Sequence, residues 1–213
     1  EKIQNDYSSI SDVSVLNDVI YFIGSSPVVP AELVSISLAE NTINTLRQSR
    51  EATIDASFIS EAEFIEFDTT ENAKSFALFY PPKHAHSQGA PDEKPPLLVM
   101  SHGGPTSATS TSYNLAIQYW TSRGIAVVDV NYRGSSGFGR AYRNALRNQW
   151  GVFDTADCIA AARFLEQRGD VDGSRMAIRG GSAGGYTTLC ALTFHDVFQA
   201  GASFYGVADA EIL

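Results

Sequence analysis

The stretch MAIRGGSAGGY, residues 176–186, places one serine between two pairs of glycines, directly after a short apolar run. Gly180, Ser182 and Gly184 match the pattern G-x-S-x-G, which is informative only between a strand and a helix. Residues 174–179 are typical of such a strand, and residues 182–195 predict the helix. We therefore predict a sharp turn whose glycines prevent a steric clash and which raises the serine hydroxyl at a helix N-terminus.

A glycine-rich turn can also bind phosphate, but the glycine spacing here excludes the two common phosphate motifs. The pattern G-x-G-x-x-G is absent around Ser182, and Gly137 and Gly139 are followed by Tyr142 where the third glycine should be. No Gly-Lys-Ser/Thr sequence follows a glycine loop, which excludes a P-loop. We interpret Ser182 as a catalytic nucleophile and Gly180 and Gly184 as the glycines of a nucleophile elbow.

A nucleophile elbow requires an oxyanion hole, with one N–H from the residue after the serine and one from the loop after an earlier strand. The segment SHGGP, residues 101–105, follows a continuous apolar run and fits that loop. We predict Ala183 N–H as the first donor and Gly103 or Gly104 N–H as the second. His102 lies in this loop and precedes the elbow, so we do not expect it to be the catalytic base.

The sequence after residue 96 alternates between apolar runs and helical patterns. Strands are predicted near 97–101, 125–131, 174–179 and 200–207, and helices at 114–124, 153–169 and 182–195. Asp154 is a candidate N-cap for the second helix, and Gly169 ends it. This alternation predicts an α/β domain with a mostly parallel sheet covered by helices on both faces.

The sequence before residue 96 reads as β structure. Short strands are predicted at 18–24, 31–41 and 42–49, and a second β unit at 63–69 and 73–82. We expect the first 50 residues to form a sheet of their own. Residues 83–96 predict a surface loop, where His84 and His86 have no third ligand nearby in the sequence. We therefore expect no metal site there.

Four segments in order resemble the catalytic domain of the prolyl oligopeptidase family of serine peptidases. They are HGGP, NYRGSSGFG, WGVFDTADCIAAARFL and VDGSRMAIRGGSAGGY. The HGGP sequence is similar to the acylaminoacyl-peptidase and dipeptidyl-peptidase branch, and the first 50 residues are similar to the last blade of the family's β-propeller. The resemblance implies an α/β-hydrolase fold, with the end of a propeller at 1–55 and the N-terminal part of the peptidase domain at 56–213.

The resemblance also implies hydrolysis of short peptides through an acyl-enzyme on Ser182. Acylaminoacyl-, dipeptidyl- and oligopeptidase specificities all remain open. Arg133 in the NYRGS segment is expected to be structural, and Tyr205 is expected to pack in the core rather than line the cleft.

The catalytic acid and base are harder to place. In α/β-hydrolases the order is Ser, then Asp or Glu, then His. His195 is the only histidine after Ser182, and no acidic residue lies between them. It also ends the helix that Ser182 starts, which places it roughly 20 Å away at about 1.5 Å per residue. We therefore expect the acid and the base beyond Leu213, and we expect this chain alone to be inactive.

Two further functions stay open. One is a non-catalytic remnant or interaction protein. The other is a carboxylesterase-like hydrolase, although such enzymes usually have a third glycine where this chain has Pro105.

The composition limits the classes of partner that we expect. A net charge of −9 and a pI of about 4.8 argue against nucleic acid, which requires a basic face. Cys158 and Cys190 lie in predicted helices without metal-ligand spacing, which favours a reducing compartment, the cytoplasm. No apolar run approaches the ~18 residues of a membrane span, so no membrane partner is expected. We also expect no cofactor and no metal.

Overall fold

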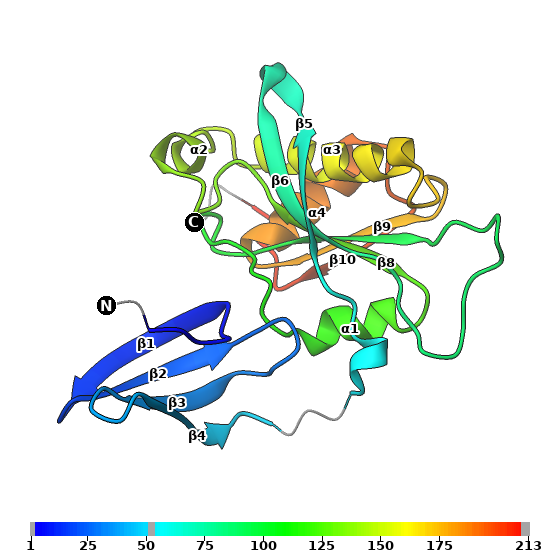
Figure 1. Cartoon of the computed structure of the whole chain (residues 1–213). Coiled ribbons are helices and arrows are strands. Elements are labelled where there is room, and N and C mark those ends of the chain that lie inside the picture. Colours follow the sequence, from blue (N-terminus) through cyan, green and yellow to red (C-terminus); the bar gives the residue numbers. More distant parts are fainter. Residues whose placement is uncertain (1–2, 51–53, 210–213) are drawn as a thin grey trace.

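The computed structural model describes residues 3–50 and 54–209, and within these residues the chain forms two separate sheets (Figure 1). The first sheet is antiparallel, with its strands in sequence order. These strands are β1 (Ser9–Leu16), β2 (Val19–Ser25), β3 (Glu32–Ser37) and β4 (Thr42–Gln48). Phe22, Val34 and Ile36 form its small core. This four-stranded meander has the form of a propeller blade, as predicted for the start of the chain.

The second sheet has the strand order β10-β9-β7-β8-β6-β5. Its strands are β5 (Glu63–Asp68), β6 (Lys74–Tyr80), β7 (Leu97–Ser101), β8 (Ala126–Asn131), β9 (Met176–Gly181) and β10 (Ala200–Phe204). The neighbours from β10 to β8 pair in parallel, and β6 and β5 extend the sheet as an antiparallel hairpin. A mostly parallel sheet is therefore confirmed.

Helices cover both faces of this second sheet (Figure 1). On one face lies α1 (Leu115–Thr121), where Ile117 packs with Leu98 and Val127. On the other lie α3 (Phe153–Arg168) and α4 (Ala183–Phe194), which bury Leu97, Val99 and Val128 of the central strands. Two short 3₁₀ turns, at Ala56–Phe58 and Thr70–Asn72, and the one-turn helix α2 (Arg140–Asn144) complete the elements. The α/β-hydrolase fold is thus confirmed.

The start of α3 differs from the prediction. Asp154 is not its N-cap, because the helix begins at Phe153 after Val152. The Asp154 side chain is fully buried and accepts hydrogen bonds from Gly151 N–H (2.6 Å) and Thr187 Oγ1 (2.5 Å). Asp154 therefore ties the beginning of α3 to α4, and burial raises the pKa of its carboxyl. The predicted end is confirmed, since Gly169 closes the helix with φ 90°.

A buried ion pair fixes the segment after β8 to α3. Arg133 Nη2 lies 2.8 Å from Asp157 Oδ1, and the two side chains are 4% and 0% exposed. The Asp157 carboxylate also accepts from Arg133 N–H at 2.7 Å and from Thr69 Oγ1 at 2.6 Å. Arg133 further donates to Thr70 Oγ1 at 2.7 Å and lies over the ring of Phe153. These contacts are the structural role that the sequence predicted for Arg133.

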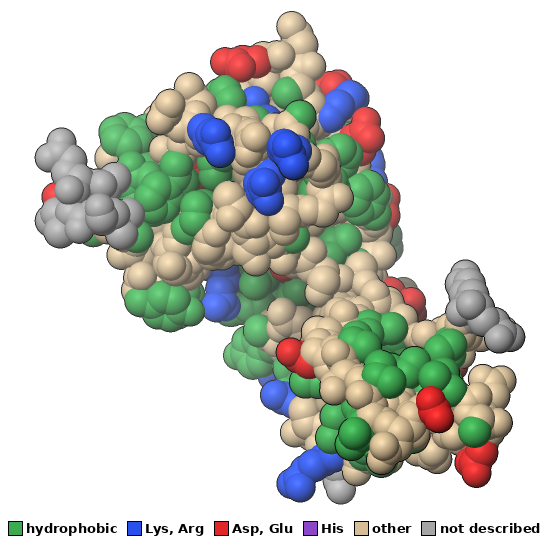
Figure 2. Space-filling model, turned by 90° about the vertical axis from the view of Figure 1, so that its left-hand side faces the viewer, with side chains coloured by type: hydrophobic (Ala, Val, Ile, Leu, Met, Phe, Trp, Pro, Cys, Tyr) green, Lys and Arg blue, Asp and Glu red, His purple; other side chains and the backbone are tan. Residues whose placement is uncertain are grey.

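The N-terminal sheet contacts the loop before α1 at the end of β2. Ser25 Oγ lies 3.0 Å from Ser112 Oγ, and Tyr113 N–H donates to Ser26 O at 2.9 Å. Figure 2 shows the result as two lobes, with hydrophobic side chains open on the lower one. The exposed large hydrophobic residues on β1 to β4 are Ile10, Val13, Val15, Leu16, Ile23, Leu33, Ile43 and Leu46.

Candidate active site

The predicted site residues lie at one edge of the second sheet. Strands β9, β7 and β8 are neighbours that run in the same direction, so their carboxyl ends meet. The elbow follows β9. The SHGGP segment begins at the last residue of β7, and the NYRGSSGFG segment begins at the last residue of β8. Open α/β sheets bind their ligands at this edge.

Ser182 has the backbone conformation of a nucleophile elbow. Its φ and ψ are 54° and −119°, it is exposed, and it caps α4 directly after β9. A non-glycine residue in this region is strained and persists only where its surroundings hold it. Hydrogen bonds from Ser182 N–H to Phe204 O (3.0 Å) and from Gly185 N–H to Ser182 O (3.0 Å) supply that restraint.

The two elbow glycines are required by close backbone contacts. A Cβ added to Gly180 would lie 2.2 Å from Gly184 O and 2.4 Å from Ser101 Oγ. One added to Gly184 would lie 2.2 Å from Ser101 O and 2.8 Å from His102 O. The strand before the serine, the helix after it and the end of β7 therefore pack backbone against backbone.

The HGGP loop lies beside the serine, as predicted. A Cβ on Gly103 would be 3.4 Å from Ser182 Cβ and 3.2 Å from Gly181 O. The loop is held by its carbonyl groups: His102 O accepts from the buried Tyr132 hydroxyl (2.9 Å), and Gly103 O from His102 Nδ1 (2.9 Å). In a trans peptide the N–H points away from the preceding C=O. The N–H groups of Gly103 and Gly104 therefore point away from the carbonyl oxygens that Tyr132 and His102 bind.

The three predicted oxyanion donors are free in the described part of the chain. Neither Gly103 N–H nor Gly104 N–H has an acceptor there. Ala183 is the first residue of α4, so its N–H has no partner within the helix. All three belong to segments that meet at Ser182. Their role in catalysis stays a prediction.

No histidine of the sequence is placed to activate Ser182. His102 is stacked on Tyr132, and its Nδ1 and Nε2 contact Gly103 O and Ser135 Oγ at 2.9 and 2.8 Å. Burial lowers the pKa of His102, which favours the neutral ring. His195 lies at the opposite end of α4 from Ser182. His84 and His86 lie in the loop before β7, and their rings contact the ring of Phe58.

One expectation is wrong. Tyr205 does not pack in the core: it is 87% exposed and has a positive φ of 41°. A Cβ on Gly181 would lie 3.0 Å from its hydroxyl, so Tyr205 lies next to the elbow instead. It follows β10 in the same way that Ser182 follows β9, which explains why it reaches the same edge of the sheet.

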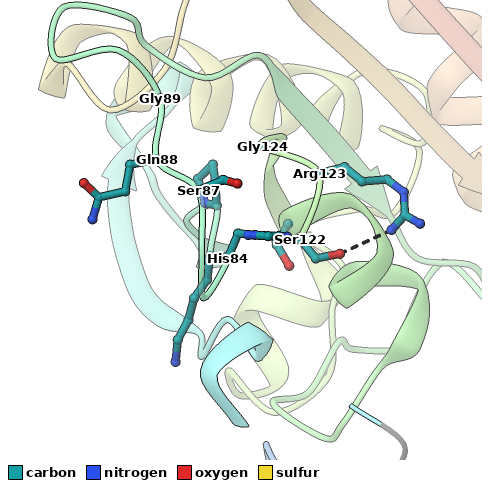
Figure 3. A pocket seen from close by; sticks show the side chains of 10 residues that line it. His84, Ser87, Gln88, Gly89, Ser122, Arg123 and Gly124 are labelled. Atoms are coloured by element: carbon teal, nitrogen blue, oxygen red, sulfur yellow. Dashed lines mark hydrogen bonds between the residues drawn. The ribbon is translucent and has the colours of Figure 1, made fainter. Parts of the chain in front are cut away.

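A cavity of about 660 Å³ lies elsewhere (Figure 3). Its lining comes from the loop after β6, with His84 and Gln88, and from the end of α1, with Ser122 and Arg123. Since α1 leads into the amino end of β8, this cavity is at the opposite edge of the sheet from Ser182. It is therefore not the candidate active site.

A smaller cavity, about 390 Å³, lies beside the HGGP loop. Its lining is Pro105, Thr106, Arg143, Asn144, Leu146, Arg147 and Trp150. Trp150 in turn packs against Tyr186 in the first turn of α4, 4.7 Å between ring centroids. Sequence reasoning named Pro105 in the HGGP segment but missed the arginines. The available signal was charge: residues 130–153 contain four arginines and no Asp or Glu, in a chain with 24 acidic residues.

The described residues contain no group of three or more His, Cys, Asp or Glu side chains that could hold a metal ion. None of the helices in residues 3–50 and 54–209 combines the length and the apolar character that a membrane crossing needs. Cys158 and Cys190 are buried free thiols.

Comparison with known proteins agrees with this geometry. The model of the prolyl oligopeptidase family matches residues 111–212, which include the elbow. Dipeptidyl aminopeptidase BIII from Pseudoxanthomonas mexicana is 38% identical over 130 residues, which cover 61% of this chain and 19% of that protein. Acylamino-acid-releasing enzyme 1 from Oryza sativa is 36% identical over 113 residues, 53% of this chain and 14% of that protein.

A solved structure extends the likeness to nearly the whole chain. A puromycin-hydrolysing peptidase from Mycobacterium tuberculosis has a TM-score of 0.94 and 40% identity, over 97% of this chain and 32% of that one. The chain thus spans a third or less of the length of these relatives. The fold, the order of the motifs and the family match agree: residues 111–212 belong to the prolyl oligopeptidase family of serine peptidases, and nearly the whole chain is similar in structure to a peptidase.

Proposed function

We propose that this chain carries the nucleophile and the oxyanion hole of a serine peptidase that hydrolyses short peptides. The observation that carries the proposal is the exposed Ser182, held at φ 54° between β9 and α4 with the HGGP loop in contact. Two of the similar proteins are peptidases by name, and a puromycin hydrolase with 36% identity was solved in complex with PGG.

In the proposed reaction, Ser182 Oγ attacks the carbonyl carbon of the scissile peptide bond. The carbonyl oxygen becomes an oxyanion, which Ala183 N–H and either Gly103 or Gly104 N–H stabilise by hydrogen bonds. The C–N bond then breaks, the amine leaves with a proton, and an ester on Ser182 remains for water to hydrolyse. A base must take the hydroxyl proton, because serine is a weak nucleophile at its free pKa.

The base and its acid partner are proposed to come from outside these 213 residues. Support comes from the four histidines, each of which either contacts other groups or lies far from Ser182.

We also propose the domain boundary after residue 55, with the N-terminal sheet as a propeller blade. In support, β4 ends at Gln48 and β5 begins at Glu63, and the two belong to different sheets. Two buried free thiols support the cytoplasm as the location.

The alternatives have less support. A carboxylesterase shares the elbow, but Pro105 occupies the position of its usual third glycine. A non-catalytic remnant agrees with the positions of the four histidines, none of which is placed to activate Ser182.

Labelling with a fluorophosphonate tests the proposal. The 213-residue chain alone should label weakly, because an elbow and an oxyanion hole without a base keep only ~10³–10⁴-fold catalysis over water. A chimera should label strongly when this chain replaces the matching third of the Mycobacterium tuberculosis peptidase. The serine of that enzyme is then absent, so the label must lie on Ser182.

The control is the same chimera with Ser182→Ala, which should not label. A folded chimera that stays unlabelled would count against the peptidase and favour the remnant. Strong labelling of the short chain that disappears with Ser182→Ala would show that a base lies within the 213 residues. A chimera that hydrolyses simple esters but no peptide would favour the carboxylesterase.

A further inference from the structure

Three arginines on and around α2 have no acidic partner. Arg140, Arg143 and Arg147 are exposed, and none of their side chains forms an ion pair or a hydrogen bond within the described residues. Among the other arginines, Arg133, Arg163, Arg168 and Arg175 each pair with a carboxylate, whereas Arg47, Arg50, Arg123 and Arg179 form no ion pair within the described residues. In a chain of net charge −9, three arginines within eight residues, in a stretch (130–153) without Asp or Glu, are a local concentration of positive charge.

The arginines line two cavities that share Arg143. The cavity of about 390 Å³ beside the HGGP loop contains Arg143 and Arg147, and a second of about 290 Å³ contains Arg140 and Arg143. Neither lining includes an Asp or Glu. Figure 2 views the side of α2, where basic side chains gather on the upper lobe with uncharged surface between them.

The larger of these cavities is close to the proposed nucleophile. Pro105 and Thr106 line the larger one and follow Gly103, which is in contact with Ser182. Three trans peptide units span at most about 11 Å, since consecutive Cα atoms are about 3.8 Å apart. An extended peptide covers about 3.3–3.6 Å per residue, so a group two or three residues from the scissile bond reaches the arginines.

We propose that Arg143 and Arg147 bind a carboxylate of the peptide substrate. This inference rests on the proposed function and adds a substrate class: short peptides with a carboxylate two or three residues from the scissile bond. A guanidinium recognises a carboxylate through two parallel hydrogen bonds, and the cavities are of a size for a small anionic group rather than for nucleic acid. The carboxylate is either the C-terminus or an acidic side chain.

Peptide binding to the 213-residue chain tests the proposal without turnover, in a Ser182→Ala background. Trp150 lines the larger cavity and Trp120 packs at the opposite face of the sheet, so the fluorescence of Trp150 reports occupation. The probes are trialanine, trialanine amide, and Ala-Glu-Ala amide with its N-terminus free. Trialanine or the glutamate peptide should bind about 10-fold more tightly than trialanine amide, the lower range for a charge-assisted hydrogen bond.

Arg143→Gln and Arg147→Gln should each remove that preference. Arg123→Gln is the matched control, because it removes the same charge from an exposed arginine at the other cavity and should keep the preference. Preference for trialanine assigns the C-terminus, and preference for Ala-Glu-Ala amide assigns an acidic side chain. Equal binding of all three peptides, or an equal loss in Arg123→Gln, would overturn the proposal.

The two proposals fail separately. Arginine-dependent binding together with an unlabelled chimera removes the peptidase and leaves a carboxylate site. A labelled chimera with arginine-independent binding keeps the peptidase and removes the carboxylate site.

Discussion

Replacing Asp157 by asparagine should strongly destabilise the chain. The Asp157 carboxylate is fully buried and accepts from three nitrogens of Arg133: N–H at 2.7 Å, Nη2 at 2.8 Å and Nε at 3.1 Å. Asp157→Asn leaves a guanidinium that is 4% exposed without a counter-charge and turns an amide donor toward its N–H groups. Breaking a buried pair from one side costs about 3–5 kcal/mol.

The expected change can be measured by thermal unfolding followed by circular dichroism. At about 2–4 °C per kcal/mol for a chain of this size, Asp157→Asn should lower the Tm by about 6–20 °C. Arg175→Gln is the control, because its ion pair with Asp172 is exposed (43% and 30%) and should contribute less than about 1 kcal/mol. It should lower the Tm by no more than about 4 °C.

The double variant Arg133→Met/Asp157→Leu separates the charge effect from a packing effect. Removing both charges together avoids an unpaired buried ion, so this variant should be more stable than Asp157→Asn alone. The reasoning is refuted if Asp157→Asn changes the Tm no more than Arg175→Gln, or if the double variant loses at least as much as the single one.

Two further predictions concern the elbow and a buried acid. Gly184→Ala should lower the free energy of unfolding by more than about 3 kcal/mol, because the new Cβ would lie 2.2 and 2.8 Å from backbone atoms. Gly89→Ala is the control: the nearest atom to its new Cβ would be 3.7 Å away, so it should be nearly neutral in the same thermal assay. Burial raises the pKa of Asp129 from 3.8 to about 6, so its stabilising contribution is complete below about pH 4 and is lost as the pH rises through 6. At about 1.36 kcal/mol per pKa unit, Asp129→Asn should therefore raise the free energy of unfolding by up to about 3 kcal/mol relative to the parent at pH 7, and by little at pH 4. A stability difference that stays the same between pH 4 and pH 7 would contradict this prediction.

The sequence predicted the centre of the second sheet well because β7 and β8 are buried on both faces. These two strands are nearly continuous apolar runs that end in glycine loops, and the elbow after β9 has a fixed local pattern. β1 was missed, since seven of its eight residues are exposed and its polar and apolar residues lose their alternation at Ser11 and Asp12, where the pairing with β2 also shifts register. α2 was missed because five residues are too few for a helical period.

The remaining misses depend on tertiary contacts. Asp154 has the residue type and position of a helix cap. However, α4 packs against α3, and the Asp154 carboxylate accepts a hydrogen bond from Thr187 Oγ1. The partner of Arg133 lies 24 residues away and is apparent only once β8 and α3 are adjacent. Similarly, the cavity with Arg143 and Arg147 joins the loop after β7 to the segment after α2, which no local pattern reveals.

The loop between β7 and α1 has a mechanical consequence. Gly103 and Gly104 lie near its start, and Ser112 and Tyr113, near its end, form hydrogen bonds with Ser25 and Ser26 at the end of β2. Between them, Thr109 N–H donates to Asn131 Oδ1 at 2.8 Å and its hydroxyl to buried Asp129. Any displacement of the N-terminal sheet would therefore reach the two glycines only through Thr109, which is fixed to the end of β8. This fixed point would hold the glycines in position beside Ser182.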